Sequence, residues 1–279
     1  MSPIVRYESL LKMSSKKYKN IYINGCSFTA GHNLPQETSW PRLLGDKLGL
    51  NTICKAVNGQ SFDSIFLNTI NHLSMLDSKD TLVVIGTTWS TRYSIPFDEI
   101  TANVTPVDIV GKNKHKSVKE KFDDKIRLDR RIASPYTLDR AEVKELHNDF
   151  YTDGDIDKPT EKKERFDKLM MSFAHYYEHK VEFDDNLFTN EHIDLMSKVV
   201  ALQGFLEKHN FEYRFVDFFN IFRLREEKLD LWKQPIFKMF DEENVIYFNG
   251  KWREKYIEGH PTQEGCHNVS EVLYDSFNR

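Results

Sequence analysis

The run Thr81-Leu-Val-Val-Ile-Gly86 constrains the fold more than any other stretch of this chain. Its apolar residues follow one another without the polar alternation of a strand that has one face in water. Such a strand is typical of a parallel sheet, whose two faces are both covered by helices. The apolar segment Ile21–Ile23 has the same character on a shorter scale. We therefore expect a layered fold with a buried central sheet.

Segments with helical and with strand periodicity alternate on either side of this run. The predicted helices cover residues 38–49, 61–73, 191–209 and 261–277. The predicted strands cover residues 21–23, 51–57, 80–86, 211–218 and 244–248. Strand-helix-strand repeats of this length favour parallel strands joined by right-handed crossovers. The pattern predicts an α/β protein, a three-layer α/β/α sandwich around a five-stranded, mainly parallel, flavodoxin-like sheet.

The α/β pattern is interrupted in the middle of the chain. Residues 95–190 are strongly charged and only partly helical in pattern, so we interpret them as a large insertion or cap. The core is then expected to comprise residues 20–94 and 191–279, with residues 1–19 as an N-terminal arm. A hydrophobic content of 39% in 279 residues is sufficient for a substantial core of this kind.

Composition excludes several classes of protein. The net charge of −4 does not favour a nucleic-acid partner, and the basic run at residues 111–131 is interpreted as a solvated face. Three scattered cysteines cannot form a disulfide framework or a zinc ribbon, which favours a reducing compartment. The sequence shows no signal-peptide pattern and no apolar run long enough to cross a membrane, so a cytoplasmic location is expected.

A serine follows the first predicted strand directly, in the turn Gly25-Cys-Ser-Phe-Thr-Ala-Gly31. Gly25 and Gly31 allow sharp bends, which would expose Ser27 at the carboxyl end of the strand. A nucleophilic hydroxyl needs this exposure and nearby backbone N–H groups to stabilise an oxyanion. A capping serine in a tight turn is the alternative interpretation. The neighbouring thiol of Cys26 is not expected to be the nucleophile.

The C-terminal stretch Glu258-Gly-His-Pro-Thr-Gln-Glu-Gly-Cys-His267 places a carboxylate, histidines and a helix start together. His260 is the candidate general base and Glu258 the acid that would orient it. His267 is a weaker candidate for the base, because it lies inside the predicted helix. Asp217, at the end of the fourth predicted strand, is an alternative supporting acid.

Four motifs would meet at one sheet edge, since the carboxyl ends of parallel strands gather there. They lie at residues 25–31, 58–61, 86–92 and 258–267. Gly-Cys-Ser-Phe-Thr-Ala-Gly, then Asn-Gly, then Gly-Thr-Thr-Trp, then His-Pro-Thr resembles the SGNH (GDSL-like) hydrolases, in particular divergent phage and bacterial members. The resemblance covers about residues 20–92 and 245–275 and leaves the insertion outside.

The resemblance implies a role for each matching residue. Ser27 matches the nucleophile and His260 the base, and no metal or organic cofactor is required. The oxyanion hole would use the N–H groups of Ser27 and Gly59. Two positions depart from the pattern: Glu258 stands where the family has Asp, and Thr88 stands where the family has the Asn that supplies a third oxyanion donor. The residues expected to contact substrate are Asn58, Trp89 and Arg92.

A competing motif, His175-Tyr-Tyr-Glu-His179, fits the inverted zinc-peptidase pattern His-x-x-Glu-His. On a helix the two histidines would share a face, and Glu178 could activate a metal-bound water. Such matches arise easily in a chain with 10 histidines. A metal-dependent hydrolase is therefore the less favoured hypothesis.

The sequence thus predicts a serine esterase that hydrolyses a small acyl ester, such as an O-acetyl group, on a small molecule or a glycan. The aromatic residues near the predicted edge and the family resemblance support a carbohydrate substrate. An O-acyltransferase with the same fold is one alternative. A carbohydrate-binding relic that has lost turnover is the other.

Overall fold

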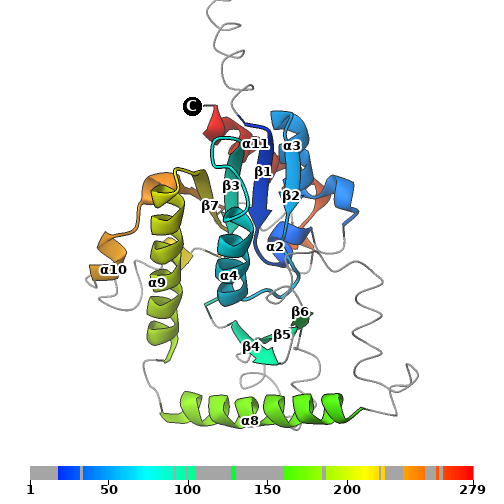
Figure 1. The fold of residues 1–279 in the computed structure, drawn as a ribbon, viewed down its shortest axis with the longest axis vertical. Coiled ribbons are helices and arrows are strands. Elements are labelled where there is room, and N and C mark those ends of the chain that lie inside the picture. The colour runs from blue at the N-terminus through cyan, green and yellow to red at the C-terminus, as the bar shows by residue number, and fades with distance from the viewer. Residues whose placement is uncertain are drawn as a thin grey trace, which may run out of the picture. The chain divides into compact units, whose positions relative to one another are not determined.

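The computed structural model describes two compact units (Figure 1). One comprises Met1–Ser90 with His192–Arg279, and the other comprises Thr91–Glu191. The described residues are 18–31, 34–90, 92–97, 100–104, 127–129, 160–183, 187–219, 221–223, 235–248, 256–257 and 260–278. Most of the predicted N-terminal arm lies outside these ranges.

The first unit is built on a five-stranded sheet in the order β2-β1-β3-β7-β8. Each of its four pairings is parallel. The predicted α/β class and the predicted five-stranded parallel sheet are confirmed. The strands are β1 (Asn20–Asn24), β2 (Asn51–Cys54), β3 (Thr81–Gly86), β7 (Glu212–Asp217) and β8 (Val245–Tyr247).

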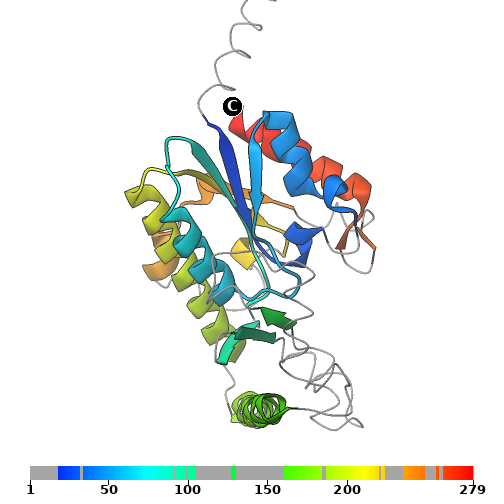
Figure 2. The same ribbon diagram turned by 45° about the vertical axis from the view of Figure 1, so that its right-hand side comes forward.

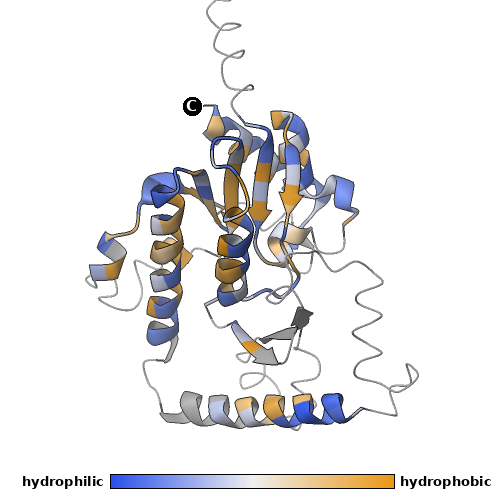
Figure 3. Ribbon diagram, viewed as in Figure 1, coloured by the Kyte–Doolittle hydropathy of each residue, from blue (hydrophilic) through white to orange (hydrophobic). Residues whose placement is uncertain are grey.

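Helices cover both faces of this sheet, which gives three layers (Figure 2). One face carries α4 (Phe62–Leu73) and most of α9 (Leu187–Lys208), and the other carries α3 (Trp40–Leu48) and α11 (Gln263–Phe277). Side chains of β3 alternate between the two cores: Val83 and Ile85 pack with α4 and α9, whereas Leu82 and Val84 pack with α3 and α11. This explains the continuous apolar run, and Figure 3 shows the same hydrophobic character along the central strands.

Side chains and glycines set several helix boundaries. The Ser61 hydroxyl caps α4 by accepting from the Ser64 N–H, and the Thr262 hydroxyl caps α11 by accepting from the Gly265 N–H. Gly49 ends α3 in the left-handed conformation. The final helix, α11, begins two residues later than predicted, because His260–Pro261 form the short strand β10, which pairs with β9 (Tyr256–Ile257). The shorter helices are α2 (Ser27–Ala30), η1 (Gln36–Thr38), η3 (Ile221–Arg223), α10 (Pro235–Lys238) and η5 (Glu242–Asn244).

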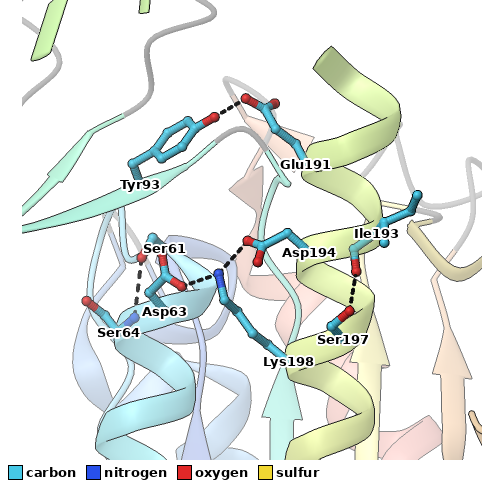
Figure 4. Close-up of polar contacts among 9 residues, drawn as sticks. All are labelled: Ser61, Asp63, Ser64, Tyr93, Glu191, Ile193, Asp194, Ser197 and Lys198. Atoms are coloured by element: carbon cyan, nitrogen blue, oxygen red, sulfur yellow. Dashed lines mark hydrogen bonds and ion pairs between the residues drawn. The ribbon is translucent and has the colours of Figure 1, made fainter. Parts of the chain in front are cut away.

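An ion-pair network fixes α9 against α4 within the first unit (Figure 4). The Lys198 ammonium lies 2.5 Å from a carboxylate oxygen of Asp63 on α4 and also contacts Asp194 one turn away on α9. The side chains of Lys198 and Asp63 are partly shielded from water, which strengthens their pair relative to a fully exposed one, whereas the Asp194 side chain is 63% exposed.

The second unit contains strands that the sequence did not predict. The strands β4 (Tyr93–Phe97), β5 (Ile100–Val104) and β6 (Arg127–Asp129) form an antiparallel sheet, and α8 (Glu161–Phe183) is a long helix. The Tyr93 ring lies 5.5 Å from that of Phe173, and its hydroxyl donates to Glu191, as Figure 4 shows for the latter contact. No helix among the described residues of either unit is long and apolar enough to span a membrane.

The ends of β1 and β3 approach each other around a fully buried threonine. A Cβ added to Gly86 would lie 2.2 Å from the Thr29 hydroxyl oxygen, and one added to Gly25 would lie 2.3 Å from it. Neither distance is sterically possible, so Thr29 requires glycine at both positions. The turn that carries Ser27 is therefore closely packed against the end of β3.

We expect Gly86→Ala to lower the free energy of unfolding by about 1–3 kcal/mol, the usual cost of overpacking a core. Gly204→Ala on α9 is the matched control, since nothing lies within 4 Å of its added Cβ. That control should stabilise the helix by about 0.5–1 kcal/mol. Urea denaturation measures both changes. An equal response of the two variants, or a failure of Thr29→Ala to recover the loss in Gly86→Ala, would contradict this packing.

We also expect a pH effect from His192, which burial holds neutral. Burial lowers the pKa of its imidazole to about 4, against the hydrogen bond to the Ile221 backbone. Because the pKa of His192 is lower in the folded than in the unfolded protein, its neutral form contributes fully to the free energy of unfolding above pH 6.5. This contribution is lost as the pH falls toward 4. The loss amounts to about 3 kcal/mol. His192→Gln should flatten the pH dependence of the free energy of unfolding in this window, and a pH dependence equal to that of the wild type would contradict this role of His192.

Candidate active site

The first unit places the predicted serine turn at the carboxyl edge of the sheet. The last residue of β1, Asn24, is buried, and its amide nitrogen donates to the Ile65 carbonyl (3.2 Å) and the Thr69 hydroxyl (3.0 Å). Its amide oxygen accepts from the Gly25 N–H at 2.9 Å. The amide nitrogen of Asn24 therefore anchors the strand end to α4 through two hydrogen bonds, and its amide oxygen holds the start of the serine turn. Gly31 ends α2 in the left-handed conformation, as the bend after Ser27 requires.

Ser27 and His260 meet across 233 residues of sequence. The Ser27 hydroxyl oxygen lies 2.8 Å from Nε2 of His260. Ser27 has 5% of its surface exposed and His260 is half-buried, so little water competes for this contact. In the tautomer whose Nε2 accepts, the ring hydrogen is carried by Nδ1. This arrangement can remove a proton from the hydroxyl and return it to a leaving group.

An aromatic row extends from the histidine to an exposed tryptophan. The Phe28 ring lies 4.8 Å from the His260 ring and 4.6 Å from the Phe219 ring, which lies 4.6 Å from Trp89. Trp89 is 49% exposed, a large fraction for an apolar ring. The row continues on its buried side to Phe218 and Trp40. Sequence reasoning missed Phe219; the adjacent phenylalanines Phe218 and Phe219 at the end of the fourth predicted strand were the available signal.

The predicted oxyanion residues flank the serine turn. The Val57 N–H donates to the Gly25 carbonyl at 3.1 Å, which brings the following loop, with exposed Asn58 and with Gly59 at φ +77°, beside the turn. Thr88 is fully buried, and its hydroxyl donates to the Gln60 carbonyl at 2.9 Å. The resemblance places Thr88 in the oxyanion hole as a possible third donor; the structure shows its hydroxyl donating to the loop, and the oxyanion role stays a prediction.

Of the two candidate acids, Asp217 forms hydrogen bonds with backbone N–H groups and a threonine. Its carboxylate accepts from the N–H groups of Phe219 and Phe222, both at 3.0 Å, and from the Thr87 hydroxyl at 3.3 Å. Burial raises the pKa of this carboxyl, and these donors oppose the rise. Asp217 thus shapes the turn that carries Phe219. Glu258 lies outside the described residues.

The remaining predicted residues lie elsewhere. The His267 side chain is 60% exposed on α11 and is 3.7 Å from Glu271, whereas His260 contacts Ser27. The buried thiol of Cys26 lies 3.5 Å from the Thr87 carbonyl oxygen. Arg92 belongs to the second unit, so its predicted place beside the substrate stays a prediction.

The alternative metal motif falls on α8. Residues 175–179 are helical, but the side chains of His175, Glu178 and His179 are outside the described part. Among the residues that are described, no group of three or more His, Cys, Asp or Glu side chains could hold a metal ion. The metal hypothesis therefore stays a sequence prediction.

No family model and no curated protein matches the chain. It is similar in structure to a psychrotrophic esterase from Pseudoalteromonas sp., with 12% identity, 92% of this chain and 96% of that chain covered, and a TM-score of 0.41. It is also similar to a carbohydrate esterase family 2 enzyme with a carbohydrate-binding domain from Corynascus thermopiles (Myceliophthora fergusii), with 10% identity, coverages of 93% and 65%, and a TM-score of 0.42. A third similar structure is an acetyl xylan esterase from the rumen bacterium Butyrivibrio proteoclasticus, with 10% identity, 92% of this chain and 63% of that chain covered, and a TM-score of 0.37. At such identities and TM-scores these likenesses assign no activity.

We expect Asp217→Asn to destabilise the protein. The substituted amide nitrogen would face a backbone N–H of Phe219 or Phe222 and leave a buried donor unpaired, at a cost of about 1–3 kcal/mol. Asp241→Asn is the control, because this less buried carboxylate caps a single 3-10 turn. Thermal and urea unfolding of both variants would measure the difference. Wild-type stability in Asp217→Asn would show that the carboxylate does not support the turn.

Proposed function

We propose that this protein is a serine esterase whose nucleophile is Ser27 and whose general base is His260. The observation that carries the proposal is the 2.8 Å contact between the Ser27 hydroxyl oxygen and Nε2 of His260 at the carboxyl edge of a parallel sheet. A histidine in this position raises the nucleophilicity of a hydroxyl that is otherwise unreactive at neutral pH. Ligands of open α/β sheets bind at this same edge.

The reaction follows from the contact. His260 takes the hydroxyl proton as the Ser27 oxygen attacks the ester carbonyl, and the N–H groups of Ser27 and Gly59 stabilise the oxyanion. Collapse of the tetrahedral intermediate breaks the bond to the alcohol oxygen, which leaves with the proton from His260. His260 then takes a proton from water as the water oxygen attacks the acyl-enzyme; the bond between the acyl carbon and Oγ of Ser27 breaks, the carboxylic acid leaves, and His260 returns the proton to Oγ. Glu258, two residues before the base, is proposed to orient the imidazole.

The substrate is proposed to be a small acyl ester, such as an O-acetyl group on a carbohydrate-like alcohol. This part follows the resemblance of the sequence motifs to SGNH hydrolases. The exposed Trp89, packed on Phe219, offers a flat ring near the site, and Asn58 is exposed on the neighbouring loop. Arg92 is proposed as a further substrate contact.

We expect Ser27→Ala and His260→Ala each to lower kcat/KM for p-nitrophenyl acetate by about 10³-fold or more, since both groups act in the same proton transfer. A fluorophosphonate probe should label Ser27 in the wild type and fail to label Ser27→Ala. A chelator should leave turnover unchanged.

Two matched controls accompany these variants. Ser74→Ala and His267→Ala remove an exposed serine directly after α4 and an exposed histidine on α11, and both variants should retain activity. Turnover that survives Ser27→Ala and disappears with the chelator would refute the serine mechanism and direct attention to His175 and His179.

A further inference from the structure

Two buried polar residues beside the serine turn have no part in the proton transfer. Gln60 follows β2 and Thr88 follows β3, and both are fully buried. Since β1 lies between β2 and β3 in the sheet, any contact between these residues spans the carboxyl end of β1. That end carries the turn with Ser27.

Hydrogen bonds and contacts show which residues after β2 and β3 lie beside which residues of the serine turn. On the β2 side, hydrogen bonds continue past the strand, from the Lys55 N–H to the Ile23 carbonyl (2.8 Å) and from the Val57 N–H to the Gly25 carbonyl (3.1 Å). With Val57 beside Gly25, the next residues of the loop continue alongside the serine turn. On the β3 side, the Thr87 carbonyl oxygen lies 3.5 Å from the Cys26 thiol.

The Thr88–Gln60 contact closes this arrangement. The Thr88 hydroxyl donates to the Gln60 carbonyl at 2.9 Å. The Gln60 N–H donates to the Val57 carbonyl at 3.2 Å, and the Gln60 side-chain oxygen accepts from the Val57 N–H, also at 3.2 Å. Gln60 thereby closes a tight loop around Gly59, whose φ of +77° suits glycine.

Gln60 is fully buried, and its side-chain oxygen holds the Val57 N–H at 3.2 Å. Burial and this hydrogen bond both restrict the loop that contains Gly59. This loop holds the proposed second oxyanion donor.

We propose that Thr88 and Gln60 are positioning residues that hold the Gly59 N–H in place as an oxyanion donor. The Thr88 hydroxyl acts through the loop and does not itself bind the oxyanion, because its hydrogen is already donated to the Gln60 carbonyl. The oxyanion is then served by two backbone N–H groups, of Ser27 and Gly59. This inference rests on the proposed esterase function.

The test compares Thr88→Val, which keeps the shape and removes the hydroxyl, with Thr88→Ser, which keeps the hydroxyl. For p-nitrophenyl acetate we expect Thr88→Val to lower kcat by about 10–100-fold with little change in KM, because the lost interaction matters in the transition state. The pH profile of kcat/KM should keep its midpoint, since His260 is unaltered. Thr88→Ser should recover most of the kcat.

Hydrogen exchange provides a readout that does not depend on turnover. The Gly59 amide should exchange faster in Thr88→Val than in Thr88→Ser, because the loop loses a hydrogen bond. Gln60→Met, which removes the side-chain acceptor of the Val57 N–H, should change kcat and exchange in the same direction.

Wild-type kcat in Thr88→Val, or equal losses in the Val and Ser variants, would overturn the positioning role. Ser27→Ala measured in parallel separates two failures. If Ser27→Ala keeps wild-type turnover, the esterase function and the positioning role both fail. If Ser27→Ala is inactive while Thr88→Val retains its kcat, only the positioning role fails.

Discussion

The position of β1 between β2 and β3 is the constraint on which the candidate site depends. Parallel pairing on both sides brings three strand ends to one edge, so that the segments after Asn24, Cys54 and Gly86 lie side by side. A glycine lies near each strand end: Gly25 directly after β1, Gly59 with φ +77° in the loop after β2, and Gly86 as the last residue of β3. The contact of Thr29 with two of these glycines is possible only because the strand ends are this close.

His260 lies near the C-terminal end of the chain, so its contact with Ser27 forms only when the whole first unit has folded. It precedes α11, which packs on α3 through buried Cys266, Val269 and Leu273. Arg214 of β7 adds a hydrogen bond to the Ser276 carbonyl at 3.2 Å, which ties the end of α11 to the sheet. A site assembled by long-range packing has little tolerance for loosening anywhere in that core, since hydrogen-bond distances must be kept within a fraction of an ångström.

The sequence predicted what local pattern can specify. The apolar run at Thr81–Ile85 identified a central strand, because a strand that is buried on both faces has apolar residues at successive positions. The proximity of Ser27 and His260 was predicted from motifs, and their contact is present in the structure. The partners of Asp217 and Thr88 were not predictable. Several donors and acceptors meet at a sheet edge, and only the folded backbone decides which pairs reach hydrogen-bond distance. The strands β4–β6 carry no comparable apolar pattern.

The hydrogen bonding of Thr88 bears on how this site could stabilise charge. A side-chain donor must be ordered at some entropic cost before it can meet an oxyanion, whereas a backbone N–H in a constrained loop is already placed by folding. The buried hydroxyl of Thr88 and the closed loop at Gln60 both restrict the backbone near Gly59. A displacement of about 1 Å at such a site can reduce the rate by about 10²-fold, so a residue that holds a donor can matter as much as the donor. In the proposed mechanism, a side chain that orders the backbone would therefore take the place of a side-chain donor to the oxyanion.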